Sequence, residues 1–133
     1  MSEFHLIETK FKDQSVLVST LKEMGYSPEI HKKAKNLQGY QGDKRNQKAH
    51  IIIPRKQVGT ASNDVGFEKN EKGFVLHASA FDKAWRDGNR IKTLNKKYAE
   101  NKLVKEVGRT SNFNILSRKD LNDGKVEIQL RVN

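Results

Sequence analysis

Apolar and polar residues alternate along the first stretch of the chain, from Phe4 to Phe11. A period of two is typical of a strand with one buried face, so this stretch is predicted to form a strand. Asp13 then offers a side-chain oxygen to cap a helix, and apolar residues recur at helical spacing over residues 14–24 until Gly25 ends the helix. Residues 26–33 are expected to return as a second strand, so that the helix covers a sheet.

A run of glycines and cations, NLQGYQGDKRNQK at residues 36–48, follows this strand. We expect it to be an exposed and mobile connection, because glycine and polar residues interrupt regular structure and cations are costly to bury. A short apolar strand at 50–54 comes next, and then a loop at 57–63. Two further segments, 65–69 and 73–78, flank the residues NEK and predict a β-hairpin.

The pattern changes to helical spacing for the longest segment of the chain, residues 82–107. Gly88 is a weak point within this segment, and Gly108 ends it. The apolar stripe drifts around the helix, so one kinked helix and two separate helices both fit the pattern.

Alternating residues reappear at 113–116 and 126–132, on both sides of Asp123-Gly124, a pair that suits a tight hairpin turn. Two helices among several antiparallel strands predict an α+β fold. We expect a two-layer sandwich, a mostly antiparallel sheet with two helices on one face, in a ferredoxin-like arrangement elaborated with a C-terminal hairpin. The length of 133 residues predicts a single domain, residues 1–133.

The absence of cysteine excludes disulfides, thiolate metal sites and cysteine nucleophiles. Nothing in the sequence resembles a signal peptide or an apolar run long enough to cross a membrane. We therefore expect no membrane partner. The expected location is the cytoplasm, of a bacterium or of a phage-infected host, or the plastid stroma.

The formal net charge of +10 admits two explanations. Clustered cations release counterions when they bind phosphates, which favours a nucleic-acid partner. Alternatively, the bias toward 19 lysines and 11 asparagines, against 7 arginines, arises in AT-rich genomes whatever the protein does. Because specific readout of phosphates and bases relies on arginine, the excess of lysine leaves both explanations open.

Two segments concentrate the cations: residues 31–57 hold eight cations and one acid, and residues 82–109 hold nine cations and four acids. We expect these segments to merge in part into one positive surface. The candidate residues for binding an anion or a partner are Lys32, Lys33, Lys35, Gly39, Tyr40, Gly42, Lys44, Arg45, Lys48, Arg86, Arg90 and Lys97. Replacing Lys44, Arg45 and Lys48 together with serine is expected to change the free energy of unfolding by less than about 1 kcal/mol, as is usual on a surface.

The motif Gly39-Tyr40-Gln41-Gly42 carries two alternatives. Glycines bring backbone N–H groups close to a phosphate, but known phosphate-binding loops lead from a strand into a helix, and here a strand follows. The favoured interpretation is a turn in which glycine permits a positive φ and Tyr40 packs on the sheet. Tyr40 and Trp85 are also candidate stacking groups for a nucleic acid, although each is more often part of a core.

Catalytic chemistry is not indicated by any constellation of residues. The histidines at positions 5, 31, 50 and 77 are scattered, and no pair has the spacing of metal ligands on a helix. His5 and His77 would line a small-molecule pocket only if the two side chains met across neighbouring strands. The serines lack a nucleophile-elbow context, and no carboxylate pair indicates acid–base work. We therefore predict no catalytic residue, no metal site and no cofactor.

Four stretches of the chain resemble a known family: MSEFHLIETKFKDQSVLVSTLKEMGY, NLQGYQG, DVGFEKNEKGFVLHA and TLNKKYAENKLVKE. They are similar to the uncharacterised cyanobacterial and plastid proteins called hypothetical chloroplast frame thirty-five, a domain of unknown function. The most specific pieces are Gly39-Tyr40-x-Gly42, Asp64-Val65-Gly66-Phe67 and Lys97-Tyr98-Ala99 before Lys102. The resemblance implies an intracellular α+β domain and transfers no catalytic residue.

The chain also departs from this family. The segments DKRNQK and QVGTASN are more cationic and longer than the family leads us to expect, and HASAF stands where the family has acidic residues. A partner shared across the family is therefore expected to bind less well here.

Together these features predict a small non-catalytic binding or adaptor module for a protein partner. It is expected to present a sheet edge, the Gly-Tyr-x-Gly loop and the basic surface, because recognition sites are commonly built from such loops and surfaces. The alternative is weakly specific nucleic-acid binding through the basic surface.

Overall fold

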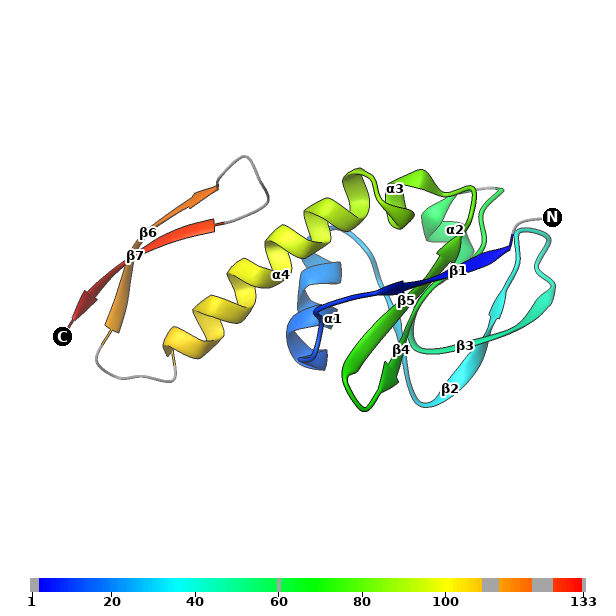
Figure 1. Cartoon of the computed structure of the whole chain (residues 1–133), viewed down its shortest axis with the longest axis horizontal. Coiled ribbons are helices and arrows are strands. Elements are labelled where there is room, and N and C mark those ends of the chain that lie inside the picture. Colours follow the sequence, from blue (N-terminus) through cyan, green and yellow to red (C-terminus); the bar gives the residue numbers. More distant parts are fainter. Residues whose placement is uncertain (1–2, 60, 109–112, 121–125, 133) are drawn as a thin grey trace.

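The largest sheet of the molecule is antiparallel and has five strands in the order β1-β5-β4-β3-β2, and it occupies the right-hand part of Figure 1. The structure is a computed structural model that describes residues 3–59, 61–108, 113–120 and 126–132. The elements are, in chain order, β1 (Phe4–Glu8), α1 (Gln14–Glu23), β2 (Glu29–Gln38), β3 (Lys44–Ile53), α2 (Arg55–Val58), β4 (Val65–Asn70), β5 (Gly73–Ser79), α3 (Lys83–Arg86), α4 (Asn89–Gly108), β6 (Phe113–Asp120) and β7 (Val126–Val132).

Helix α1 begins where the sequence predicts it. The Asp13 carboxylate accepts the backbone N–H of Val16 at 3.1 Å, so Asp13 is the N-cap. Past the other end lies Gly25, whose φ of +99° falls in the left-handed region that glycine tolerates best. The predicted start and stop signals of this helix are therefore confirmed.

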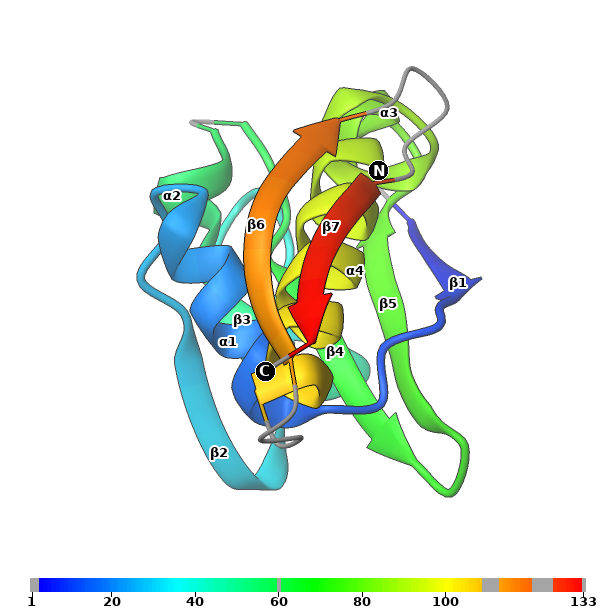
Figure 2. The same ribbon diagram turned by 90° about the vertical axis from the view of Figure 1, so that its left-hand side faces the viewer.

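Helices α1 and α4 cover one face of the sheet, which we call the inner face (Figures 1 and 2). Alternate strand residues and the apolar stripes of the two helices meet there in the main core. Its buried residues are Phe11, Val16, Leu17, Val18, Leu21, Ile51, Ile53, Val65, Phe67, Phe74, Leu76, Ala78, Trp85, Ile91, Leu94 and Tyr98. The predicted α+β sandwich, a mostly antiparallel sheet with two helices on one face, is confirmed.

The ferredoxin-like detail of that prediction is not confirmed. Strands β2 to β5 follow one another as an antiparallel meander, and β1 adds to the sheet beside β5. A ferredoxin-like sheet is instead built from split βαβ units. Helix α1 thus carries the chain from one edge strand of the sheet, β1, to the opposite edge strand, β2.

The long helical segment consists of two helices rather than one kinked helix. The Asp82 carboxylate caps α3 by accepting the N–H of Trp85 at 3.2 Å. The chain then turns at Gly88, whose N–H donates to the Lys83 carbonyl at 2.7 Å. A Cβ on Gly88 would lie 2.8 Å from that carbonyl oxygen, so the close approach explains why a glycine occupies the break.

The hairpin of β2 and β3 folds back over the other face of the sheet, which we call the outer face. Two register shifts in its pairing bend the hairpin sharply. The bend places Gln38, at the end of β2, beside Asp64 at the start of β4. The N–H of Gln38 donates to Asp64 Oδ2 at 2.8 Å, and the N–H of Asp64 donates to the Gln38 carbonyl at 2.9 Å. This pair of hydrogen bonds clasps the tip of the hairpin to the sheet.

The prediction that residues 36–48 form an exposed connection is wrong. Residues 36–38 and 44–48 belong to paired strands, and only residues 39–43 form a turn. The error has a physical cause: the segment DKRNQK carries no apolar residue, so its strand pairing leaves no alternation of apolar and polar residues to detect. The predicted strands at 26–33 and 50–54 accordingly overlap the longer β2 and β3, although residues 26–28 and Pro54 lie outside them, and α2 occupies part of the predicted loop at 57–63.

The folded hairpin encloses a second, smaller core on the outer face. Leu37, Ala49 and Ile52 are buried there, and Phe4 of β1 packs against them. Gly66 forms the floor, since a Cβ at this position would lie 2.7 Å from the Ala49 Cβ and 2.7 Å from Leu37 Cδ2. The missing side chain of Gly66 therefore makes the room that the hairpin occupies.

Strands β6 and β7 form a separate two-stranded sheet and confirm the predicted C-terminal hairpin. Their register runs from Phe113 opposite Val132 to Asp120 opposite Val126. Both strands contact α4. The predicted turn at Asp123-Gly124 lies outside the described residues.

Candidate partner-binding groove and basic ribbon

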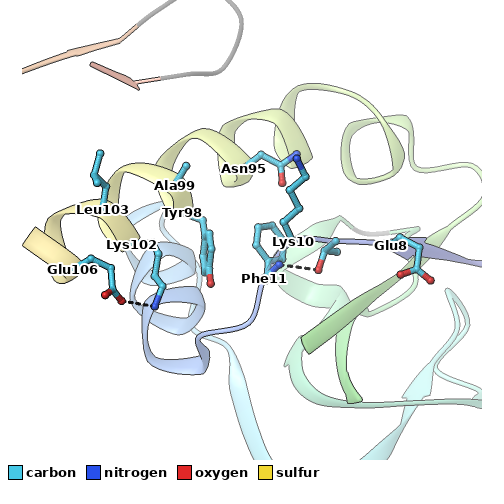
Figure 3. Close-up of a pocket in the computed structure, with 10 residues that line it drawn as sticks. Glu8, Lys10, Phe11, Asn95, Tyr98, Ala99, Lys102, Leu103 and Glu106 are labelled. Atoms are coloured by element: carbon cyan, nitrogen blue, oxygen red, sulfur yellow. Dashed lines mark hydrogen bonds and ion pairs between the residues drawn. The ribbon is translucent and has the colours of Figure 1, made fainter. Parts of the chain in front are cut away.

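A groove of about 660 Å³ runs between the end of β1, the connection that follows it, and the C-terminal half of α4 (Figure 3). We call it the β1–α4 groove. It is lined by Glu8, Thr9, Lys10, Phe11, Asn95, Tyr98, Ala99, Lys102, Leu103 and Glu106. Its lining residues on α4 recur at spacings of three, four, seven and eight residues, which place them on one face of the helix. One face of α4 therefore forms a complete wall.

The floor of the β1–α4 groove is apolar and firmly held. Phe11 is 1% exposed, and its ring lies 4.8 Å from that of Tyr98 and 6.1 Å from that of Phe67, measured between centroids. The Tyr98 hydroxyl accepts the backbone N–H groups of Lys12 at 3.1 Å and Asp13 at 3.0 Å. Because ring contacts and hydrogen bonds fix Tyr98 at both ends, the floor is preorganised.

The rim of the groove is charged. Lys102 Nζ lies 2.8 Å from Glu106 Oε1 and 3.2 Å from Asp13 Oδ2. The hydrogen bond to Glu106, followed by that to Asp13, raises the pKa of the Lys102 ammonium above its usual value. Leu103, next to Lys102, is 41% exposed although it is a large apolar residue. The groove thus offers apolar contact with fixed charges beside it.

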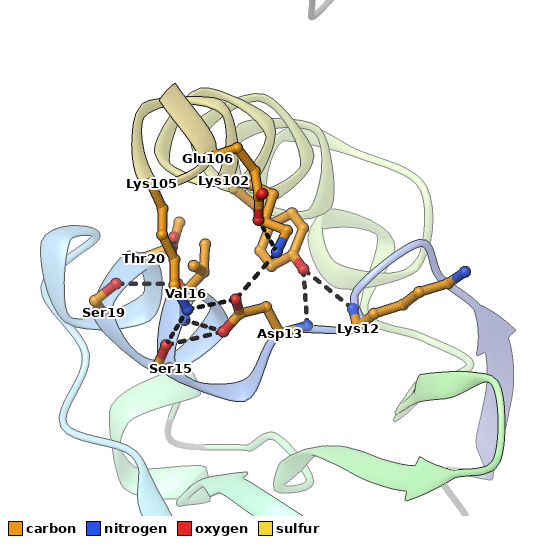
Figure 4. Close-up of polar contacts among 10 residues, drawn as sticks. Lys12, Asp13, Ser15, Val16, Ser19, Thr20, Lys102, Lys105 and Glu106 are labelled. Carbon is orange, nitrogen blue, oxygen red and sulfur yellow. Dashed lines mark hydrogen bonds and ion pairs between the residues drawn. The ribbon is translucent and has the colours of Figure 1, made fainter. Parts of the chain in front are cut away.

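A polar cluster around Asp13 ties α4 to the start of α1 (Figure 4). The Asp13 carboxylate accepts hydrogen bonds from Lys105 Nζ at 2.7 Å and from Ser15 Oγ at 2.8 Å, in addition to capping α1. These hydrogen bonds hold the pKa of the Asp13 carboxyl well below its usual range, and the bond from Lys105 lowers it the most. The cluster fixes the position of the helix wall relative to the groove floor.

Neither the groove nor this cluster is predicted from the sequence. Asp13 is predicted only as a helix cap, and Lys102, Leu103 and Lys105 are not among the predicted site residues. The one local signal is the spacing of Lys102 and Glu106, which is that of an ion pair on a helix. The contacts to Asp13 join residues about ninety positions apart and leave no local pattern.

Five of the predicted surface lysines lie on the β2–β3 hairpin and are exposed. We call them the basic ribbon, and they are Lys32, Lys33, Lys35, Lys44 and Lys48. Lys35 Nζ lies 3.9 Å from Glu29 Oε1, at the limit of an ion pair. Lysines on an edge strand also have a structural role, because they discourage pairing with other chains.

Arg45 differs from these lysines, because its side chain is only 17% exposed. Its Nε donates to Asp43 Oδ2 at 2.5 Å, and its Cζ lies 5.9 Å from the centre of the Phe4 ring. The Arg45 guanidinium lowers the pKa of the Asp43 carboxyl. Gly39 is in contact with the same guanidinium, which a Cβ would displace. Arg45 therefore holds the hairpin tip against β1.

The Gly-Tyr-x-Gly motif forms the turn of this hairpin. The N–H of Gly39 donates to the Asp43 carbonyl at 2.7 Å, and the N–H of Gly42 donates to the Gly39 carbonyl at 2.8 Å. Gly42 has a φ of +80°, as the turn interpretation requires. The N–H groups of both glycines are thus engaged within the turn, and Tyr40 is half-buried.

The three predicted cations of the second basic segment lie on α3 and α4. Arg86 Nη1 donates to the Ala80 carbonyl at 2.7 Å, Lys97 Nζ lies 3.4 Å from Glu23 Oε1, and Arg90 is exposed. Helix α1 lies between α4 and β2, because it lines grooves with residues of both. The two basic segments are therefore set apart by α1, an arrangement that does not favour the predicted merging.

His5 and His77 lie on opposite faces of the sheet, so the pocket considered for them is excluded. The register pairs His5 with Ala78 and Leu6 with His77, and successive residues of a strand point to opposite faces. His77 Nε2 instead lies 2.9 Å from Glu68 Oε1. Among the described residues, no group of three or more His, Asp and Glu side chains is placed to hold a metal ion. None of the described helices combines the length and the apolar character needed to cross a membrane.

Residues 20–129 match the model of a protein family described as "Protein of unknown function (DUF1257)". The chain belongs to the DUF1257 family. The resemblance to a family of unknown function is thereby confirmed. The α4 wall of the groove and the basic ribbon both lie within the residues that match DUF1257, whereas β1 and Asp13 precede them. No curated protein and no solved structure matches the chain.

Proposed function

We propose that this protein is a non-catalytic binding or adaptor module that holds a protein partner in the β1–α4 groove. The observation that carries the proposal is the combination of a preorganised apolar floor with a charged rim. Protein interfaces commonly have this anatomy, an apolar centre surrounded by polar residues. An enclosed reaction centre is not required for this role.

The chemistry of the groove favours a short segment of a partner with one apolar anchor. Leu103 and Ala99 offer an apolar wall to such an anchor, and Phe11 lies beneath it. Lys102 and Glu106 at the rim offer both signs of charge to the residues that flank it. A segment with an apolar residue next to a charged residue therefore fits the groove better than a bare polar peptide does.

Leu103→Asp tests this proposal, with Phe81→Asp as the matched control. Both positions expose a large apolar side chain, 41% for Leu103 and 74% for Phe81, but only Leu103 lines the groove. A partner that binds in stoichiometric amount to the wild-type protein is expected to be lost with Leu103→Asp and kept with Phe81→Asp, measured by quantitative affinity capture at physiological salt. Equal loss with both variants, or no stoichiometric partner of the wild type, contradicts the proposal.

Weakly specific nucleic-acid binding is the second candidate. The observation that favours it is the basic ribbon, which gathers five exposed lysines on one two-stranded hairpin. Such binding weakens as salt rises, and the logarithmic slope falls by roughly one for each phosphate-contacting lysine that is removed. Titration of an oligonucleotide against Lys32→Ser/Lys33→Ser/Lys35→Ser and the wild type measures this slope. A response to salt that is flat for both proteins removes this candidate.

The proposed site of action is the cytoplasm or the plastid stroma. The absence of cysteine supports this location, because proteins of oxidising compartments commonly use disulfides.

A further inference from the structure

The two edge strands of the sheet differ in how they are protected from pairing with another chain. Strand β2 carries Lys32, Lys33 and Lys35 and is bent by register shifts, both of which are devices that prevent edge pairing. Strand β1 has the sequence FHLIE, without lysine, arginine or proline, and keeps one register with β5 from Phe4 to Glu8. Among the described strands, β1 pairs with β5 and with no other strand, so its other side is an open edge. In Figure 2, β1 lies at the right-hand margin of the molecule.

The backbone groups that β1 presents at this edge can be identified. The N–H of Ala80 donates to the Glu3 carbonyl at 2.7 Å, so Glu3 forms a hydrogen-bonded pair with Ala80 of the chain beside it. Hydrogen-bonded and non-hydrogen-bonded pairs alternate along antiparallel strands. The N–H and C=O groups of Phe4, Leu6 and Glu8 therefore point away from β5 and toward the open edge.

We propose that β1 pairs antiparallel with β1 of a second copy of this chain, around a two-fold axis at Leu6. In this register Leu6 lies opposite Leu6 of the second copy, and Phe4 lies opposite Glu8. All three outward-facing residues of each strand then fall in hydrogen-bonded pairs, which is the register that satisfies their backbone groups. The two sheets become one continuous sheet. This inference goes beyond the proposed groove function and does not depend on it.

The side chains are complementary in the same register. Leu6 is 57% exposed in the single chain, and at the two-fold axis it gains an apolar neighbour. Glu8 of one copy comes opposite Phe4 of the other copy, whose ring lies 5.9 Å from the Arg45 guanidinium carbon. Phe4, Leu6 and Glu8 share the outer face with Arg45, because alternate strand residues point to one side. The Glu8 carboxylate of each copy thus approaches the Arg45 guanidinium of the other copy, which lies over the Phe4 ring of that same copy.

A five-residue edge buries little surface, so the dimer is expected to be weak and to depend on protein concentration. Its test is the mass of the full chain in solution, measured by light scattering from low to high micromolar concentration. The wild-type protein is expected to pass from monomer to dimer over this range. Leu6→Lys places two like charges opposite each other at the axis and is expected to raise the dissociation constant by about tenfold or more.

The matched control is Ile30→Lys on the other edge strand, because Ile30 is an apolar residue of similar exposure, 50%. It is expected to leave the dissociation constant unchanged. A mixture of Leu6→Lys and Leu6→Glu is expected to restore the dimer as a heterodimer, since only at the two-fold axis do the two positions meet. A wild-type protein that stays monomeric at high micromolar concentration overturns the proposal. So does a Leu6→Lys variant that dimerises like the wild type, or a mixture that shows no recovery.

Discussion

The two faces of the sheet are covered in different ways. On the inner face, helices bring large side chains such as Trp85, Leu17 and Leu94 onto alternate strand residues. On the outer face, the sheet covers itself, because the β2–β3 hairpin folds back and encloses a small cluster of Leu37, Ala49 and Ile52, with Phe4 at the border. The inner face is stabilised chiefly by apolar burial. The outer face is stabilised in addition by the hydrogen bonds of the Asp64 and Arg45 side chains.

This difference shows how a chain with few apolar residues buries both faces of one sheet. Apolar burial contributes in proportion to area, so the inner face dominates the free energy of folding. The outer face needs little apolar area because hydrogen bonds and the Arg45 guanidinium over the Phe4 ring position the hairpin. We therefore expect substitutions on the two faces to differ in size and in kind.

The largest expected effects come from the same substitution made on each face. Leu76→Ala, in the inner core, is expected to lower the free energy of unfolding by about 4 kcal/mol, and Leu37→Ala, in the outer core, by about 2–3 kcal/mol. Both leucines are 0% exposed, but the hairpin is freer to collapse around a cavity than the helix-covered core is. Urea unfolding measures both values, and a larger loss for Leu37→Ala would reverse the comparison.

An overpacked outer core is expected to have the next largest effect. Gly66→Ala places a Cβ 2.7 Å from Ala49 Cβ and from Leu37 Cδ2, and the strain is expected to cost about 1–3 kcal/mol. The double variant Gly66→Ala/Ala49→Gly removes one of the clashing methyl groups. It should therefore recover part of the loss in urea unfolding. Additive losses in the double variant would show that the two residues are not in contact.

Substitutions of Asp13 test whether polar contacts also contribute to the free energy of unfolding on the inner face. Its pKa is lowered in the folded protein, so its ionised form contributes stability above the unfolded pKa of about 3.9, and that contribution is lost as the pH falls below this value. Asp13→Ala is expected to cost about 1–2 kcal/mol at pH 7, because it removes the cap together with the contacts to Lys102 and Lys105.

Asp13→Asn separates the two roles, since asparagine also caps helices. It should cost less than Asp13→Ala, and the free energy of unfolding should depend less steeply on pH between about 2 and 4 than in the wild type. Unfolding curves at several pH values measure this slope. An unchanged slope would assign the acid sensitivity to other carboxylates.

The smallest expected effects distinguish the contacts of Arg45 at the hairpin tip from the exposed lysines of the basic ribbon. Arg45→Ala alone is expected to cost about 1 kcal/mol, because it removes the ion pair with Asp43 and the contact with Phe4. This corrects the limit expected from the sequence for the triple serine variant, which treated Arg45 as an exposed cation. Lys44→Ser/Lys48→Ser is expected to change the free energy of unfolding by less than about 0.5 kcal/mol, as is usual for exposed positions. Thermal denaturation compares the two variants. If they are equal, the guanidinium does not hold the hairpin tip.

The elements that a local pattern encodes were predictable from the sequence. The alternation from Phe4, the cap at Asp13 and the stop at Gly25 define β1 and α1 without reference to the rest of the chain. The same holds for the β4–β5 hairpin. The sequence does not decide whether the long segment is one kinked helix or two helices at Gly88, because a glycine weakens a helix whether or not it ends one.

The candidate groove was not predictable in the same way. Its floor joins Phe11 to Tyr98, and its wall is held through Asp13 by Lys102 and Lys105. Each of these residues has an ordinary local explanation, as a strand end, a helix cap or a solvated helix position. The groove exists only where the end of β1 meets α4.

By itself, the sequence determined where most of the helices and strands lie, because burial of one face imposes a period on apolar residues. Only the tertiary structure decided the fold of residues 36–48. The missing Cβ of Gly66, the carboxylate of Asp64 and the ring of Phe4 together make room for the hairpin and hold its tip. These three residues are far from the hairpin along the chain, and hydrogen bonds and ring contacts impose no period on the sequence that forms them.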